Sequence, residues 1–200
     1  MVKQSTNLKI EQGQRTYGDL LTIAGNLFAK QGYAATTTEE IIHIAGVTKG
    51  ALYHHFSTKR LLFEAVYVEA EQTLAAKIDT ASSNANEPWE QLMSGCYAYL
   101  EACSDPDLQQ ILRIDGPSVL GLVYWRKIDQ QFGFDRLLPF LEHLSVTNVI
   151  NVPSVTAFVY QLTGAMNEAT FWIAQHSQRE LALEESKLTL RVLLQGVRVK

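Results

Sequence analysis

Hydrophobic residues recur at helical spacing along most of this chain. Between Tyr17 and Lys30 they lie at positions i, i+1, i+4, i+7 and i+8, which form one face of an amphipathic helix. These residues are Leu20, Leu21, Ala24, Leu27 and Phe28. Gly32 follows and is expected to end the helix, because glycine readily adopts the backbone conformation that closes one. Residues 1–14 show no such period and are expected to form a flexible N-terminal arm.

Two short helices and one longer helix are predicted next. The short helices cover residues 38–45 and 48–55, and Gly46 separates them. The longer helix begins at Lys59 and continues to about residue 81. Serine or threonine precedes each helix, where its hydroxyl group can accept a hydrogen bond from a free backbone N–H.

The rest of the chain is also helical by its pattern. A loop-like stretch at 82–87 is followed by further amphipathic segments, and the most periodic of these are 155–173 and 183–197. Alternation typical of a strand is confined to 146–152. The pattern therefore predicts an all-α fold.

Composition and charge narrow the class of protein. Hydrophobic residues make up 46% of the chain and charged residues 19%, which excludes a disordered protein. The net charge is −4, but it is unevenly distributed. Residues 1–67 hold seven Lys/Arg and five Asp/Glu, which leaves ten and sixteen of the totals of 17 and 21 for residues 68–200. Such asymmetry is typical of a chain that meets a polyanion at one end.

The two cysteines and the uncharged segments indicate the compartment. Cys96 and Cys103 lie seven residues apart in a helical stretch, hence roughly 10 Å apart, too far for an easy disulfide. They are interpreted as core residues of a reducing compartment. The N-terminus does not resemble a signal peptide, and the longest uncharged run, Leu144–Asn167, contains asparagines and a proline. We therefore expect a cytoplasmic protein without a membrane partner.

The two short helices carry the candidate chemistry. Two such helices joined by a glycine turn form a helix-turn-helix when the second can enter the major groove of DNA. In the second helix Lys49 and Tyr53 lie one turn apart, as do Gly50 and His54, so these four residues share one face. Leu52 lies off this face and is expected to pack inward. Lysine donates to guanine edges, and histidine and tyrosine donate to bases or phosphates, so this face is predicted to read DNA.

The same segment resembles a known family. The run TEEIIHIAGVTKGALYHHFSTKRLLF, from Thr38 to Phe63, is similar to the DNA-binding signature of TetR-type (AcrR-type) repressors. The resemblance covers residues 15–66, about a quarter of the chain. It implies an N-terminal three-helix helix-turn-helix domain over 15–66, and a C-terminal helical domain over 67–200 that binds an effector and forms a dimer.

The resemblance also implies DNA-binding roles for individual residues. The positions expected to contact phosphates are Thr38, Tyr53, His55 and Lys59. The positions expected to face bases are Lys49, Gly50, Ala51 and His54, and Thr48 at the start of the helix completes the set. The implied partner is a palindromic double-stranded DNA operator bound by a homodimer. Glu39 and Glu40 depart from a basic surface and are expected to limit non-specific affinity.

Residues of the second domain are candidates for two further sites. The resemblance implies that the last two helices pair with those of a second subunit through Val155, Phe158, Leu162, Ala165, Ala169, Ile173, Leu190, Leu193, Leu194 and Val197. A small-molecule effector site is expected to use aromatic and polar side chains. The candidates are Trp89, Tyr97, Trp125, Phe140, Tyr160, Thr163, Asn167 and Phe171. Ordinary packing within the chain is the alternative for both sets.

Enzymatic activity finds little support. None of the five histidines stands at metal-ligand spacing with another ligand, and neither a glycine-rich phosphate loop nor a nucleophile elbow is present. No catalytic residue, metal or cofactor is therefore expected. The expected function is a ligand-responsive repressor. The alternative is a DNA-binding regulator or architectural factor without a small-molecule ligand, and the number of genomic sites would separate a local repressor from a structural factor.

Overall fold

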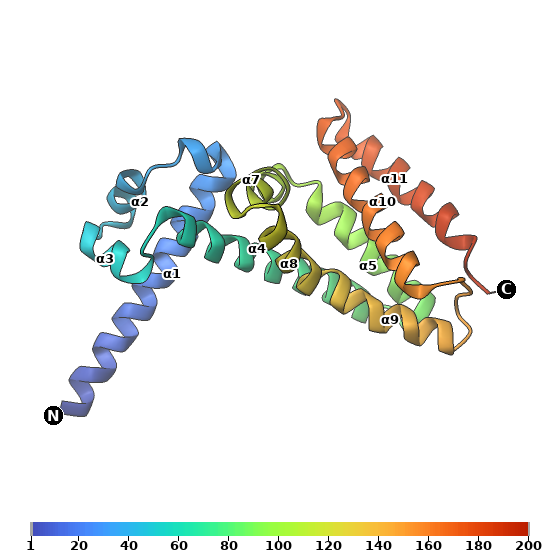
Figure 1. Cartoon of the computed structure of the whole chain (residues 1–200), viewed down its shortest axis with the longest axis horizontal. Coiled ribbons are helices and arrows are strands. Elements are labelled where there is room, and N and C mark those ends of the chain that lie inside the picture. The colour runs from blue at the N-terminus through green and yellow to red at the C-terminus, as the bar shows by residue number, and fades with distance from the viewer. Residues whose placement is uncertain (1, 200) are drawn as a thin grey trace. The chain divides into compact units, whose positions relative to one another are not determined.

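The computed structural model describes residues 2–199, and side chains for residues 11–199. Within this range it is built from helices and one isolated β-bridge, which confirms the all-α fold (Figure 1). The elements are α1 Val2–Ala35, α2 Thr38–Ala45, α3 Lys49–His55, α4 Lys59–Ser83, α5 Pro88–Cys103, α6 Pro106–Gln109, η1 Gln110–Asp115, α7 Gly116–Leu120, α8 Leu122–Phe132, α9 Phe134–Val146, α10 Val155–Gln175 and α11 Arg179–Gln195. None of the described helices combines the length and apolar character needed to span a membrane.

The chain divides into two compact units, which are described separately. The first comprises Met1–Ala70 and Gln110–Leu122, and the second comprises Glu71–Gln109 and Val123–Lys200. The domain boundary expected between residues 66 and 67 stays a prediction, and the two compact units differ from it in one respect. A segment from the middle of the chain belongs to the N-terminal unit, and local periodicity contains no information on such a distant contact.

The core of the first unit joins its first four helices. Phe28 of α1 and Phe63 of α4 are fully buried, with their rings 5.3 Å apart in an edge-to-face arrangement. Ile41 of α2 and Leu52 of α3 are also fully buried. Because α2 and α3 have eight and seven residues, they are too short to be stable alone. Their positions therefore depend on these apolar contacts.

Helix α1 differs from its prediction at its beginning but not at its end. It starts at Val2, so the segment 1–14 that was expected to form an arm is helical from its second residue. Apolar periodicity marks the side of a helix that packs against other parts of the protein. A helical segment that is held only by its own backbone hydrogen bonds need not show this periodicity. Near the other end, Gly32 has a φ of 79° and a ψ of 164°, which confirms that glycine interrupts the helix there.

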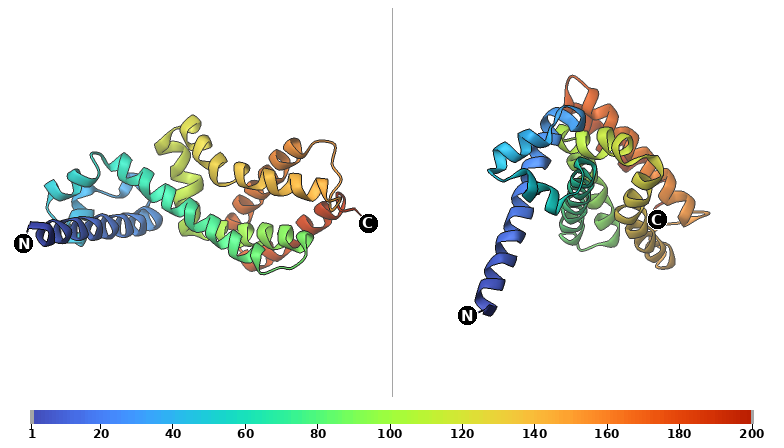
Figure 2. Two further views of the ribbon diagram at one scale, coloured as in Figure 1. Left: turned by 90° about the horizontal axis from the view of Figure 1, so that it is seen from below. Right: turned by 60° about the vertical axis from the view of Figure 1, so that its left-hand side comes forward.

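The second unit packs α5, α9, α10 and α11 around a common core. Buried side chains of this core include Trp89, Leu100, Leu144, Leu162 and Leu190. Helices α10 and α11 lie side by side (Figures 1 and 2).

The segment expected to alternate like a strand forms a short pairing instead of a sheet. Ile150 and Arg198 form an isolated antiparallel bridge. The Asn151 N–H donates to the Val197 carbonyl at 2.8 Å, and the Val199 N–H donates to the Val149 carbonyl at 3.0 Å. These hydrogen bonds hold the C-terminal residues beside the loop after α9.

We expect both cysteines to be unreactive in the folded protein. Cys96 and Cys103 are buried, and burial raises the pKa of the Cys96 thiol to about 12, so the reactive thiolate is scarce at neutral pH. Titration with an aromatic disulfide reagent at pH 8 should detect both thiols promptly in denaturant and neither promptly in buffer. Rapid labelling of the native protein would show that the core around α5 is open.

We expect Gly32→Ala to destabilise the protein by about 1–3 kcal/mol, because its backbone conformation is essentially restricted to glycine. The added Cβ would also lie 3.2 Å from Nε2 of Gln110. Chemical unfolding measures the effect. Gly18→Ala is the matched control, since a Cβ there meets nothing within 4 Å and alanine favours a helix by up to about 1 kcal/mol. Equal stability of the two variants would contradict this account.

Candidate nucleic-acid interface

Helix α2 begins and ends as its residues predict. The Thr37 hydroxyl accepts a hydrogen bond from the Glu40 N–H at 3.1 Å, so Thr37 supplies the expected cap. At the other end Gly46 has a φ of 64°, and its N–H is bonded to carbonyls of the last turn. The expected helix and its glycine break are therefore confirmed.

Helix α3 is fixed by a cap at its start and by one buried side chain. The Thr48 hydroxyl accepts from the Ala51 N–H at 3.2 Å. Leu52 is completely buried, which confirms its expected inward position. Burial of a leucine side chain contributes about 1.5–3 kcal/mol. With Leu52 turned inward, the opposite side of this helix faces solvent.

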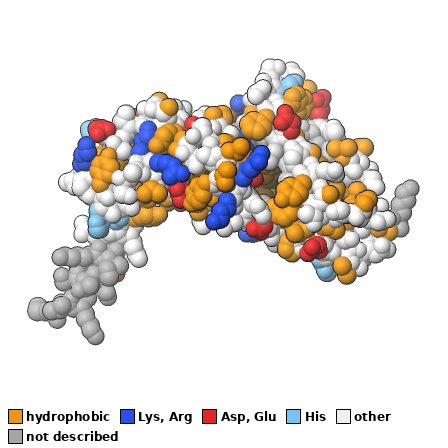
Figure 3. Space-filling view, in the orientation of Figure 1, with side chains coloured by type: hydrophobic (Ala, Val, Ile, Leu, Met, Phe, Trp, Pro, Cys, Tyr) orange, Lys and Arg blue, Asp and Glu red, His pale blue; other side chains and the backbone are white. Residues whose placement is uncertain are grey.

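The exposed side of α3 carries the four residues predicted to share a polar face. Lys49, Gly50, Tyr53 and His54 are all exposed. The Lys49 ammonium lies 5.9 Å from the centre of the Tyr53 ring. A side chain at Gly50 would meet only the Thr48 hydroxyl, at 3.8 Å, so this position leaves the backbone open to close approach. Figure 3 shows basic and histidine side chains at the surface of the region that holds α2 and α3.

Other predicted DNA-binding residues lie at the margins of this face. Thr38 and Ala51 are half-buried. His55 is also half-buried, and its ring lies edge-on to Tyr17 of α1, with 6.0 Å between ring centres. Tyr17 stacks on Phe56 at 4.9 Å, so it supports the end of α3. Sequence reasoning missed this role of Tyr17, which no local pattern indicates.

Lys59, which is predicted to contact a phosphate, is bonded to other residues of the chain in this structure. Its ammonium group donates to the carbonyl oxygens of Tyr33 and Thr36, both at 2.8 Å. It also lies 4.0 Å from the centre of the Tyr33 ring, and burial raises the pKa of that phenol. A cation bound to the carbonyls at the end of a helix is favourable. The structure thus gives Lys59 a structural role that the sequence did not predict.

Asp115 completes the junction at the end of α1. One of its carboxylate oxygens accepts from the Tyr33 N–H at 2.7 Å and from the Gln110 side-chain amide at 3.1 Å. Nearby, the Arg60 guanidinium donates to the carbonyls of Val119 and Leu120, both at 3.2 Å. No local pattern in the sequence indicates these long-range bonds of Asp115. We call Tyr33, Lys59 and Asp115 the α1 junction.

The acidic residues of α2 have separate partners. Oε1 of Glu39 lies 3.6 Å from the Lys49 ammonium. A hydrogen bond from its own backbone N–H, another from the Thr38 hydroxyl, and the charge of Lys49 lower the pKa of Glu39. Glu40 instead accepts from the side-chain amide of Gln31 at 2.8 Å. One of the two carboxylates therefore adjoins the predicted DNA-reading face.

The eight effector candidates differ in their surroundings and in how far they are buried. Trp89 is in the core, with the Arg198 guanidinium 5.0 Å from its ring, whereas Tyr160 is 62% exposed. Asn167 accepts a hydrogen bond from the Tyr99 hydroxyl. The remaining candidates, Tyr97, Trp125, Phe140, Thr163 and Phe171, are half-buried. Helical spacing places aromatic residues on a face without showing whether that face lines a cavity.

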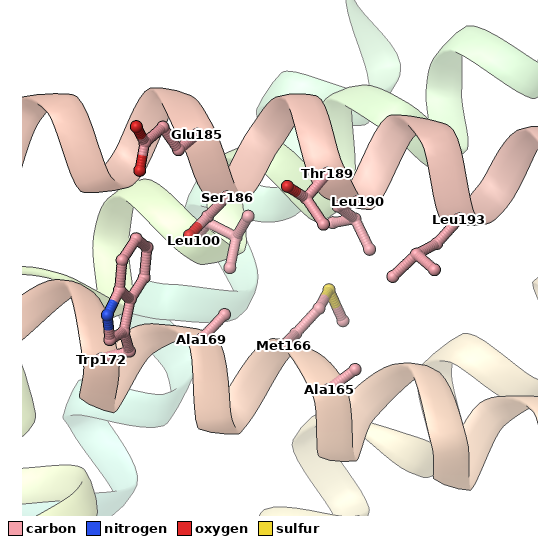
Figure 4. Close-up of a pocket in the computed structure, with 10 residues that line it drawn as sticks. All are labelled: Leu100, Ala165, Met166, Ala169, Trp172, Glu185, Ser186, Thr189, Leu190 and Leu193. Carbon is pink, nitrogen blue, oxygen red and sulfur yellow. The ribbon is translucent and has the colours of Figure 1, made fainter.

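A groove of about 270 Å³ lies between α10 and α11, and none of the eight candidates lines it. Met166 and Leu190 point into the space between the two helices (Figure 4). Trp172 and Glu185 lie toward one end of the same groove. Within the described residues, no cluster of three or more His, Cys, Asp or Glu side chains is suited to a metal ion.

The residues predicted for a dimer interface divide into two groups. Leu162, Ile173, Leu190 and Leu194 are buried in the core of the chain itself, which favours the alternative of ordinary packing within the chain. Among the others, Ala165 and Leu193 are exposed, and Val155, Phe158, Ala169 and Val197 are half-buried. Periodicity identified the apolar stripe of each helix, but this stripe faces largely inward.

Comparison with known proteins matches both parts of the chain. The family model described as "Bacterial regulatory proteins, tetR family" matches residues 20–66. The model "Tetracyclin repressor-like, C-terminal domain" matches residues 89–197, more than half of the 200 residues.

Individual relatives agree with these matches. The TetC protein of transposon Tn10 from Escherichia coli is 32% identical over 127 residues, 64% of this chain and 62% of that protein. The transcriptional repressor KstR2 of Mycolicibacterium smegmatis is 32% identical over 97 residues, 48% and 47% of the two chains. The chain thus spans less than two thirds of both relatives. A TetR-family transcriptional regulator of Pectobacterium atrosepticum has a similar crystal structure, with a TM-score of 0.79 and 29% identity over 95% of this chain and 97% of that one. Together these matches show that the chain belongs to the tetR family of bacterial regulatory proteins.

Proposed function

We propose that this protein is a transcriptional repressor that binds a palindromic DNA operator as a homodimer and is released by a small molecule. The observation that carries the proposal is the exposed face of α3, formed by Lys49, Gly50, Tyr53 and His54, with Leu52 buried behind it. A short helix held from behind can enter the major groove and present these side chains to base edges. Thr38 and His55, at the margins, are suited to phosphates.

Dimer formation is proposed through the outer faces of α10 and α11. Large apolar side chains are exposed there, and Figure 3 shows hydrophobic patches over this region. They are Trp172 (45% exposed), Leu181 (49%), Leu188 (64%), Val192 (68%) and Leu193 (62%). Apolar surface of this kind, next to an apolar groove, is typical of a protein–protein interface. A twofold axis at this interface would present α3 twice, to half-sites about 34–36 Å apart.

Release by an effector is proposed as a population shift between two conformations. Helix α4 is suited to connect the two units, because it begins at Lys59 in the α1 junction and continues to Ser83 in the second unit. Coupling of about 1–3 kcal/mol would change operator affinity about 5- to 150-fold. Operator binding measured against a broad compound library tests this step. If no compound changed the affinity, the DNA-binding regulator or architectural factor without a ligand would become the better assignment.

We expect Lys49→Ala to weaken operator binding about 5- to 150-fold, the loss of one specific base contact, and to change the preferred sequence. Selection from a random DNA library followed by affinity measurement at fixed salt checks both effects. Lys59→Met provides the contrast, because Lys59 is bonded to carbonyls of the α1 junction. It should lower the midpoint of thermal unfolding and leave the preferred sequence unchanged. An unchanged preference in both variants would remove α3 as the reading helix.

We expect Leu193→Glu to convert the dimer into monomers. A carboxylate at this position would be buried without a partner, which raises the dimer dissociation constant by about 100-fold, or roughly 3 kcal/mol. Sedimentation over a concentration series measures it. The matched control is Val146→Glu on α9, where the side chain is 86% exposed and lies outside the proposed interface. Dissociation by both variants, or by neither, would count against this face.

A further inference from the structure

The ion pair between Glu39 and Lys49 joins the start of α2 to the start of α3. Oε1 of Glu39 and the Lys49 ammonium are 3.6 Å apart, and the two side chains are 70% and 69% exposed. An ion pair this exposed to water contributes little to folding stability. The position of the ion pair is more informative than its energy, because Lys49 is the cation of the proposed base-reading face.

The pair presents a donor and an acceptor side by side. The Lys49 ammonium donates hydrogen bonds, and the Glu39 carboxylate accepts them. A G·C base pair offers the complementary pattern in the major groove, where guanine O6 and N7 accept and cytosine N4 donates. Lysine bound to guanine and glutamate bound to cytosine N4 are both favourable contacts. A phosphate backbone has acceptors only, and it repels a carboxylate.

We infer that Glu39 is a specificity-determining residue, which reads a cytosine amino group beside the guanine bound by Lys49 and weakens binding to all other DNA. On non-cognate DNA, Lys49 stays paired with Glu39 and the carboxylate repels the phosphates. On the operator, Lys49 binds guanine and the carboxylate gains a cytosine donor. This inference rests on the proposed DNA-binding function and adds Glu39 to the same surface.

Glu40 supplies a matched control on the same helix. It follows Glu39 directly and carries the same charge, but its carboxylate is bonded to the side-chain amide of Gln31 at 2.8 Å. Glu39→Gln and Glu40→Gln therefore remove the same charge from α2 and differ in their relation to Lys49. Neither glutamate belongs to the buried core, so both variants should fold as the wild type does, with only a small fall in the unfolding temperature from the charge lost in the first turn of α2.

The experiment measures the affinity of the full-length protein for its selected operator and for random duplex DNA, over a series of salt concentrations. We expect Glu39→Gln to bind random DNA more tightly than the wild type does, and the ratio of operator to random affinity to fall about 5-fold or more. Selection with this variant should lose the preference for one G·C pair. Glu40→Gln should retain both the ratio and the preference.

Two outcomes would overturn the inference. One is an equal change in both glutamine variants, which would indicate a general charge effect. The other is an undiminished effect of Glu39→Gln in a Lys49→Met background, because the inference requires the two residues to act together. If the wild type itself failed to discriminate any sequence from random DNA, the proposed function would fail instead.

Discussion

The fold of the first unit depends on the hydrogen-bond partners of the backbone groups at the end of α1. Gly32 turns the chain out of the helix and leaves backbone groups without helical partners. The Lys59 ammonium binds the carbonyls of Tyr33 and Thr36, and the Asp115 carboxylate binds the Tyr33 N–H. A cation at carbonyls and an anion at an N–H are the pairings that the charges of these groups favour. Three segments distant in sequence are thereby held at one point.

Formation of the proposed DNA-reading surface follows from this arrangement. Helices α2 and α3 have few internal hydrogen bonds, so their stability comes from caps and from burial of Ile41 and Leu52. Because α1 and α4 are fixed at the junction, the apolar core that contains these side chains is also fixed. The polar face of α3 is the consequence of burying its opposite side.

Stability and recognition use different residues in this protein. The half-buried groups of the α1 junction hold the fold, whereas the exposed pair of Glu39 and Lys49 adds little to it. The exposed apolar residues of α10 and α11 likewise contribute little within one chain. Side chains that do not stabilise the single chain are those to which the proposed function assigns DNA and a second subunit.

The sequence by itself determined the helices, their glycine breaks, the inward position of Leu52 and the polar face of α3, because each depends on neighbours within a few residues. It also carried the resemblance that places the family. Tertiary structure decided the role of Lys59, the return of Gln110–Leu122 to the first unit, and which of the apolar positions in α10 and α11 remain exposed. These features arise from contacts between distant segments, and helical spacing gives the same pattern whether an apolar stripe meets its own core, a cavity or a partner.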